Sequence, residues 1–350
     1  MRRQSELHDA LSSSDEARVV ALLDEGANIE EHNRNGWTPL MSASLYGKVD
    51  LARLLLDRGA DLYAVDAEGK SALHYAAWRG GAEAVRLLVR LGADVNATDT
   101  FGNYTPLHLA AAKCNREIVQ ETCGTLLAAG ADVDARSQWG TTALWSAAIA
   151  GRGDLVDFLV RHGAVLEIRD QQGRTVLIFV AEIDFFSDMV GRLLAHGADA
   201  DAQDAAGRTA LMYAALSAQM SVINALLDGG AHINRQDVRG ATALMYAAGE
   251  SPKASVIGML GRELSTAPEG GNAPKWDAEK KAARLAKAYR ARAEVIRHLL
   301  VRGADPALQD ADGQTALDVA RANSEVVGDD NAEVVDALSS APGEQDNNCE

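Results

Sequence analysis

The residue types that most often perform chemistry are present in this 350-residue chain, but their spacing matches no familiar catalytic motif. Residues 69–71, with the sequence Gly-Lys-Ser, resemble the end of a phosphate-binding loop. Such a loop needs a glycine five residues earlier, and Ala64 stands there instead. The histidine pair of metalloproteases and the nucleophile elbow of hydrolases are also missing from the sequence. We therefore expect a protein that is not an enzyme and holds no cofactor.

The cysteines, histidines and aspartates give no metal-binding pattern either. Cys114 and Cys123 are nine positions apart without a histidine at ligand spacing, and Cys349 stands alone. We expect reduced thiols and no metal site. Aspartates recur at predicted turns, where their side chains favour the bend: Asp66, Asp99, Asp170, Asp204, Asp237 and Asp310.

Composition limits the classes of protein that the chain can belong to. Hydrophobic residues make up 47% of it and aromatic residues only 5%, which favours many small interfaces of alanine and leucine over one bulky core. The net charge of −16 argues against a nucleic-acid binder, because phosphate binding needs a concentrated basic surface. It is compatible with a basic protein partner.

The sequence gives no sign of export or membrane insertion. Residues 1–9 contain two arginines without a following apolar run, so we see no secretory signal. No stretch approaches the roughly 18 consecutive apolar residues of a membrane helix. We expect a cytoplasmic protein without membrane insertion.

The dominant signal is an internal repeat of about 33 residues. The triplet Gly-Ala-Asp recurs with this period, for example at 59–61, 92–94 and 130–132. Eight glycines, each followed closely by a Thr/Ser-x-Leu helix start, mark the period: Gly36, Gly69, Gly102, Gly140, Gly173, Gly207, Gly240 and Gly313.

Each repeat has the signals of two short helices and a turn. Thr38 suits a helix N-cap and Pro39 the first helical position, where a missing N–H costs nothing. Small residues then make a first helix that its neighbours can approach closely. The glycine of Gly-Ala-Asp suits the left-handed position that ends a second helix. An extended segment and a turn complete the unit.

Residues 105–110, with the sequence Thr-Pro-Leu-His-Leu-Ala, match the ankyrin signature, and seven degenerate copies follow the same period. The chain therefore resembles the ankyrin-repeat family over nearly its whole length. The resemblance implies an α solenoid with β-hairpin loops, built from about nine helix-turn-helix units including the caps. We expect a capping repeat at 1–35, repeats at 36–341 with an insertion at about 250–292, and a disordered tail at 342–350.

In proteins of this family, partners dock on the hairpin tips and the exposed side of the first helices. The first four repeats place aromatic and charged residues at those positions, and such residues dominate binding hot spots. Each tryptophan could instead pack under a neighbouring hairpin. Tyr75, Phe179, Tyr213 and Tyr246 fall at an inward position, where we expect core residues. The predicted partner-binding set is Arg34, Trp37, Tyr46, Glu68, Lys70, Trp78, Arg79, Phe101, Tyr104 and Trp139.

The insertion carries an unusual excess of positive charge. From 275 to 292 there are seven Lys or Arg residues against two acids, on a predicted helix that continues into a second helix. The charges form either a solvated helix face or a docking site for an acidic group. The second interpretation gives a basic site of Trp276, Lys280, Lys281, Arg284, Lys287 and Arg290.

These features favour a non-enzymatic scaffold that binds and inhibits or regulates a protein partner, such as an immunity-type inhibitor of a toxin or effector. One alternative is a secreted effector that acts on host proteins. Another is a regulatory accessory subunit whose basic insert contacts nucleic acid or acidic lipid. We expect a monomer, and the sequence does not identify the partner.

Overall fold

The protein is described by a computed structural model that covers residues 6–79, 81–113, 118–183, 186–249, 278–327 and 331–341. Helices follow one another in pairs along the chain. The chain divides into two compact units, residues 1–171 and residues 172–350, and each is described separately.

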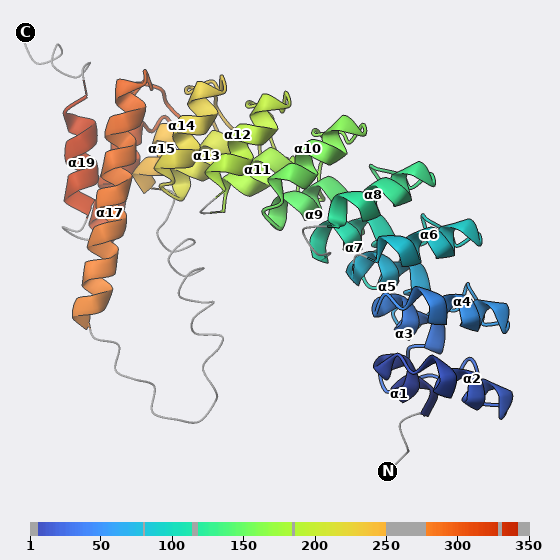
Figure 1. Cartoon of the computed structure of the whole chain (residues 1–350). Helices are drawn as coiled ribbons and strands as arrows, with labels where there is room; N and C mark the ends of the chain where they lie inside the picture. The colour runs from blue at the N-terminus through green and yellow to red at the C-terminus, as the bar shows by residue number, and fades with distance from the viewer. Residues whose placement is uncertain are drawn as a thin grey trace, which may run out of the picture. The chain divides into compact units, whose positions relative to one another are not determined.

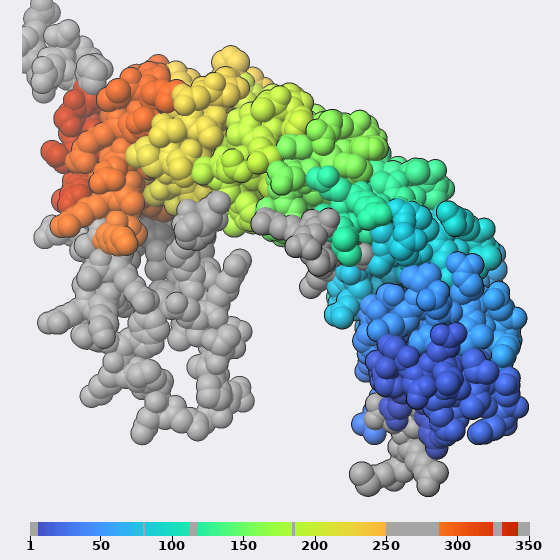
Figure 2. Space-filling model, viewed as in Figure 1, coloured from blue at the N-terminus to red at the C-terminus, as the bar shows by residue number. Residues whose placement is uncertain are grey.

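The N-terminal unit consists of five helix pairs joined by short turns. The first helices of the pairs lie side by side in one layer, and the second helices α4, α6, α8 and α10 form another layer beside it, to the right in Figure 1. Side chains of successive pairs pack directly against one another (Figure 2). The ten helices are α1 (Glu6–Ser13), α2 (Glu16–Asp24), α3 (Pro39–Leu45), α4 (Val49–Asp57), α5 (Ala72–Arg79), α6 (Ala82–Arg90), α7 (Pro106–Lys113), α8 (Val119–Ala128), α9 (Ala143–Ile149) and α10 (Gly153–Arg161).

The C-terminal unit repeats this arrangement and adds one long helix. That helix, α17 (Ala278–Val301), has 24 residues and lies beside α15 and α19. The predicted extension of a second helix into the insertion is therefore confirmed. Residues 250–277 and the tail at 342–350 lie outside the described residues. The other helices are α11 (Val176–Ala181), α12 (Ser187–Ala195), α13 (Ala210–Leu216), α14 (Met220–Asp228), α15 (Ala243–Gly249), α18 (Ala316–Val327) and α19 (Ala332–Ser339).

Small buried side chains let the first helices approach one another. Ala43, Ala76, Ala110 and Ala147 are each 0% exposed, one in each of α3, α5, α7 and α9. Stability in such a stack is the sum of contacts between neighbouring pairs. This packing accounts for the low aromatic content.

The N-cap predicted at Thr38 is confirmed, and a buried histidine joins two neighbouring repeats. The Thr38 hydroxyl oxygen accepts a hydrogen bond from the backbone N–H of Met41 at 3.3 Å. At the third helical position of α7, Nδ1 of His108 accepts from the backbone N–H of Thr105, and Nε2 donates to the carbonyl oxygen of Thr141 in the next repeat. Burial lowers the pKa of His108 from its ordinary value. The ring therefore joins two repeats in its uncharged form.

The turns around the repeated glycines, which we call tips, are joined by main-chain hydrogen bonds. In the N-terminal unit the N–H of Thr100 donates to the carbonyl of Glu68 at 2.8 Å, and that of Gln138 donates to Gly102 at 2.7 Å. Isolated bridges occur between residues 65 and 71 and between residues 236 and 242, and the described residues contain no regular strand. The expected β-hairpins are therefore not confirmed. The eight tips are 33–37, 66–70, 99–104, 137–141, 170–174, 204–208, 237–241 and 310–314.

Candidate protein-binding surface

The structure places the predicted partner-binding residues of the N-terminal unit in separate groups. Arg34 and Tyr46 line a polar pocket between α1 and α3. Other members belong to two aromatic groups, one around Tyr75 in α5 and one on the tip at 99–104. The remaining charged members, Glu68, Lys70 and Arg79, belong to neither aromatic group.

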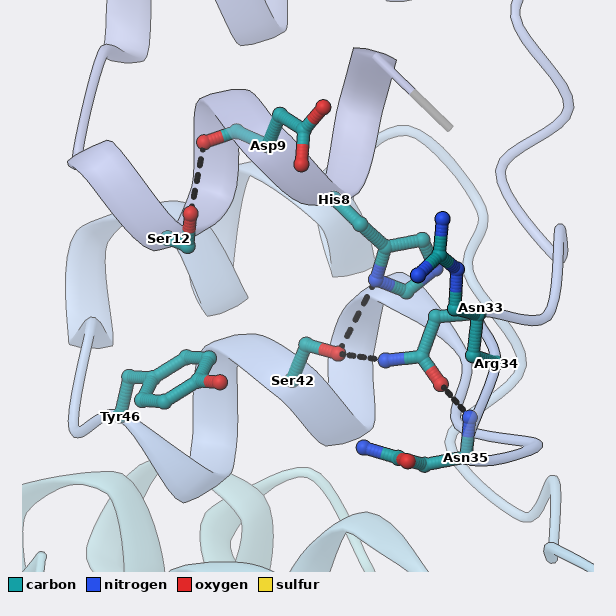
Figure 3. A pocket seen from close by; sticks show the side chains of 8 residues that line it. All are labelled: His8, Asp9, Ser12, Asn33, Arg34, Asn35, Ser42 and Tyr46. Atoms are coloured by element: carbon teal, nitrogen blue, oxygen red, sulfur yellow. Dashed lines mark hydrogen bonds between the residues drawn. The ribbon is translucent and has the colours of Figure 1, made fainter. Parts of the chain in front are cut away.

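The α1–α3 pocket is built on a chain of polar contacts (Figure 3). His8 is 6% exposed, and its Nε2 donates to the carbonyl oxygen of Glu31 at 2.8 Å. Its Nδ1 lies 3.1 Å from Oγ of Ser42, which also receives a long contact of 3.5 Å from Nδ2 of Asn33. The floor of the pocket is therefore held rigidly.

The size and lining of this pocket suit a single side chain. Its volume is about 250 Å³, smaller than the roughly 300–1,000 Å³ of sites for small-molecule ligands. The exposed residues Asp9 and Arg34 place opposite charges at its edge. Tyr46, 43% exposed, borders it at the end of α3. A polar side chain of a protein partner fits this lining.

The second group is the Tyr75 stack, which consists of Trp37, Tyr75 and Trp78. The ring centroids of Trp37 and Tyr75 are 5.0 Å apart, and those of Tyr75 and Trp78 are 6.1 Å apart. Tyr75 is 3% exposed, as predicted for a core residue, and both tryptophans are half-buried. For Trp37 and Trp78 a packing role is thus present in addition to any contact with a partner.

The third group, the tip-3 cluster, consists of Phe101, Tyr104 and Trp139. Phe101 is 66% exposed and Trp139 is 38% exposed. The centroid of Trp139 lies 6.1 Å from that of Phe101 and 5.4 Å from that of Tyr104. A Cβ added to Gly102 would lie 2.5 Å from Cζ3 of Trp139, so the absence of a side chain at Gly102 makes room for the indole ring.

An extra residue in this tip creates the cluster. Most tips are closed by a hydrogen bond from the first residue to the fifth, as from Asp204 to Arg208. Here the N–H of Asp99 donates to the carbonyl of Tyr104, one residue further along. Asn103 takes the positive φ, 53°, that a glycine has in the regular tips. The insertion thereby brings Tyr104 beside the ring of Trp139 from the following tip.

The predicted charged residues contribute less. Lys70 forms an ion pair with Glu68 on the same tip, and the side chain of Lys70 is only 16% exposed. Arg79 is exposed at the end of α5. Exposed ion pairs contribute little to stability, so this pair is of interest mainly for specificity.

A pairing between tips and first helices escaped prediction. The Tyr75 hydroxyl donates to the carboxylate of Asp66, nine positions earlier. The same contact joins Tyr213 to Asp204 and Tyr246 to Asp237, each at 2.8 Å. An aspartate followed nine residues later by a tyrosine was the available signal.

The comparisons with known proteins agree with this geometry. A family model of three ankyrin repeats matches residues 7–99, 107–204 and 178–261, which together span more than half of the chain. A second model of ankyrin repeats matches residues 80–120. The chain belongs to the ankyrin-repeat family. No protein of curated function matches it. Ankyrin repeats generally serve as protein–protein interaction modules, and the tips are therefore candidate contacts for a partner.

In the ankyrin repeats of the C-terminal unit, arginines of the tips cover aromatic rings of the first helices. The guanidinium carbon of Arg208 lies 4.7 Å from the ring centroid of Tyr213, and that of Arg174 lies 4.8 Å from the centroid of Phe179. Arg208 also pairs with Asp204 at 3.0 Å. Although burial alone would raise the pKa of Asp204, hydrogen bonds from Arg208 and Tyr213 lower it. Phe179 is half-buried instead of belonging fully to the core.

One of the seven basic residues counted between 275 and 292 is buried. Arg292 is 7% exposed, and its guanidinium donates to the carbonyl of Leu216 at the end of α13, at 3.4 Å. Tyr289 is also buried, at 4%. Helix α17 packs against α15 and α19, and since both side chains are buried, neither belongs to a surface site.

The basic site itself is only partly described. Lys287 and Arg290 are exposed, and Arg290 pairs with Glu333 of α19 at 3.2 Å. Trp276 and the side chains of Lys280, Lys281 and Arg284 lie outside the described residues. This site stays a prediction.

Two further predictions concern metal binding and the membrane. Within the described ranges, no group of three His, Cys, Asp or Glu side chains could hold a metal ion. Cys123 is buried in α8. None of the helices in the described part is long and apolar enough to cross a membrane.

Proposed function

We propose that this ankyrin-repeat chain is a non-enzymatic scaffold that binds a protein partner through the tips and first helices of its N-terminal unit. The supporting observation is the tip-3 cluster, in which Phe101 is 66% exposed beside the partly exposed ring of Trp139. Large exposed rings at adjacent tips are typical of interface hot spots, because they bury much area at a small cost in conformational entropy.

The rigidity of the tips favours this role. Main-chain hydrogen bonds join the tip of Glu68 to that of Thr100, and the tip of Gly102 to that of Gln138. The loops that present Phe101 and Trp139 are therefore ordered before binding. Less conformational freedom is then lost on association, which leaves more of the interaction energy as affinity.

The proposed consequence of binding is inhibition or regulation of the partner, as in an immunity-type inhibitor of a toxin or effector. A chain with a net charge of −16 associates rapidly with a basic protein through long-range attraction. A binding face that extends over several tips would also cover a large part of the partner's surface. Both features suit an inhibitor that acts by occlusion.

A photocrosslinking experiment tests the assignment of this face. Benzoylphenylalanine is placed at position 101 of the full chain, and in a matched control at position 238. Val238 is 72% exposed on a tip of the C-terminal unit, so the two probes are equally accessible. We expect one protein of the native cell to be crosslinked from position 101 and not from position 238. Equal crosslinking from both positions, or crosslinking from 238 alone, would contradict the proposed surface.

The inhibitory role has its own readout. The crosslinked partner is purified, and its activity is measured with increasing amounts of wild-type chain and of Phe101→Ala. We expect the activity to change with wild-type chain at stoichiometric concentration, and the variant to need a higher concentration. Binding without any change in the partner's activity would support a scaffold role and exclude the inhibitory role.

A further inference from the structure

Beneath the tip-3 cluster lies a buried carboxylate with an unsatisfied oxygen. Asp99 is 2% exposed. Its Oδ1 accepts hydrogen bonds from the backbone N–H groups of Gly102 and Tyr104, both at 3.0 Å. Its Oδ2 has no hydrogen-bond partner in the described part of the chain. Buried polar atoms are nearly always bonded in native proteins, so this exception needs an explanation.

Three other repeats show a donor that this one does not have. Asp66, Asp204 and Asp237 occupy the same place in their tips, and the Oδ2 of each accepts from a tyrosine hydroxyl. That tyrosine is the fifth residue from the Ser or Thr at the start of the first helix. In α7 the corresponding residue is Leu109, which has no donor.

Two features thus coincide at this tip. The internal donor to the aspartate is lost, and the extra residue in the same tip assembles three aromatic rings at the surface. A buried carboxylate is poorly screened by solvent, so its charge acts on groups above the rings without direct contact. The faces of aromatic rings also attract cations.

We propose that the tip-3 cluster and Asp99 form the anchor site for an arginine side chain of the protein partner. This inference rests on the proposed function and specifies its partner. Guanidinium is the best match, because it is planar, stacks on aromatic rings and stays charged. The guanidinium lies over the rings of Phe101 and Trp139 and supplies the counter-charge to the Asp99 carboxylate.

The surrounding charges support this choice. The nearby cation Lys70 is paired with Glu68, and Arg136 donates to the carbonyl oxygen of Arg169 at 2.6 Å. His74 and His108 lie near Asp99 but are buried, and burial lowers the pKa of both. No described cation therefore pairs with Asp99, and an acidic partner side chain would be repelled.

The probe for this site is a display library of random 12-residue peptides, panned against the full chain. Selected peptides are synthesised in two forms, one with arginine and one with citrulline, which has the same shape without the charge. We expect arginine to be enriched among the binders, and citrulline to weaken binding at least tenfold. Binders that require Phe101 but contain no arginine would overturn the inference and leave the proposed function intact.

Two variants connect the effect to Asp99. Asp99→Asn keeps the acceptor for the two backbone N–H groups, as Asn33 does in the first tip, where it accepts from Asn35 and Trp37. Leu109→Tyr offers Asp99 the hydroxyl that other repeats have. We expect each variant to weaken the arginine peptide at least fivefold and to leave the citrulline peptide unchanged, with unaltered helical content. Circular dichroism measures that content.

The alternative outcomes are distinct. If Asp99→Asn binds both peptides as the wild type does, the carboxylate is not part of the site and the inference is wrong. If Asp99→Asn unfolds, Leu109→Tyr decides in the same way. If no selected peptide is sensitive to Phe101→Ala, the tip-3 surface itself is wrong, and the proposed function fails with the inference.

Discussion

The hydroxyl of Tyr213 donates a 2.8 Å hydrogen bond to Oδ2 of Asp204, and this contact fastens the first helix of the repeat to its own tip. The same contact recurs between Tyr246 and Asp237. Burial and the neighbouring carboxylate raise the pKa of the Tyr246 phenol to about 12, so the hydroxyl keeps its proton at ordinary pH. Both pairs therefore stabilise the fold without depending on ionisation near neutrality.

Removing this hydroxyl should destabilise the C-terminal unit. Tyr213→Phe leaves the buried Oδ2 of Asp204 with one donor fewer, while Arg208 still donates to it at 3.0 Å, and the loss of one hydrogen bond costs about 0.5–1.5 kcal/mol. Urea unfolding followed by circular dichroism measures the loss. A variant as stable as the wild type would show that Arg208 alone satisfies the carboxylate.

The opposite change should stabilise the N-terminal unit. Leu109→Tyr adds a donor for Oδ2 of Asp99, which has no partner among the described residues. We expect the free energy of unfolding to rise by about 0.5–1.5 kcal/mol. Leu109 is half-buried, so the larger ring can reach solvent at its edge. Leu109→Phe is the matched control, since it adds the ring without the hydroxyl. Equal stability of the two variants would contradict the expected hydrogen bond.

Acidification should weaken the N-terminal unit through its buried histidines. Burial lowers the pKa of His74 and His108 in the folded state, so below about pH 6.5 the unfolded chain binds protons that the folded chain does not. Stability is then lost as the pH falls from 7 to 5, by at most about 1.4 kcal/mol per pH unit for each histidine. Other repeats have methionine at this place, as at Met41 and Met212.

His108→Met tests this origin. The variant loses the hydrogen bond to Thr141 and should be less stable at pH 7. The difference in free energy of unfolding between pH 7 and pH 5 should nevertheless be smaller than in the wild type, since one titrating group has gone. An unchanged difference would assign the pH dependence to other groups.

A side chain at Gly102 should displace the indole of Trp139. The added Cβ would lie 2.5 Å from Cζ3, well inside contact distance. We expect Gly102→Ala to shift the tryptophan fluorescence and to weaken peptide binding at the tip-3 cluster. Gly124→Ala in helix α8 is the control, because the added Cβ would lie at an ordinary contact distance of 3.5 Å from the ring of Phe158. Identical spectra for Gly102→Ala and the wild type would refute this account of the cluster.

Truncation of the exposed ring should affect binding and leave the fold intact. Phe101→Ala should weaken partner binding by about 2 kcal/mol, or roughly thirtyfold, if Phe101 is a hot spot. Trp139→Ala and Trp78→Ala should weaken it too, but with some loss of stability, since both rings pack on neighbours. Val238→Ala serves as the exposed control. Wild-type affinity in Phe101→Ala would remove it from the surface.

Spacing alone was sufficient to predict the repeats. In each repeat, the threonine, the helix of small residues and the terminal glycine determine the local backbone conformation. Neighbouring repeats provide the same surroundings each time. Thr38 and Gly59 therefore behave as the pattern predicts, with an N-cap at the first and a φ of 91° at the second. Local rules suffice wherever the environment repeats.

The binding surface could not be predicted in the same way. The ring of Trp37 packs on Tyr75 of the following repeat, and that of Trp139 packs on Gly102 of the preceding one. Both contacts depend on how two repeats meet at a tip. Arg292 was included in the count of basic residues on its helix, whereas its side chain is buried and donates to the carbonyl of Leu216. Such outcomes depend on tertiary contacts that the pattern of one segment does not contain.

Main-chain hydrogen bonds join successive tips, from residues 100, 138 and 171 in the N-terminal unit and from 205, 238 and 311 in the C-terminal unit. A few side chains, such as those of Gln138 and Gln171, add hydrogen bonds to the preceding tip. Any residue except proline supplies the same N–H and carbonyl groups. The side chains that project from the tips can therefore change without loss of the links that hold the loops together. Specificity for a partner and cohesion of the solenoid are thus encoded largely by different atoms, and a change of partner need not break the main-chain links.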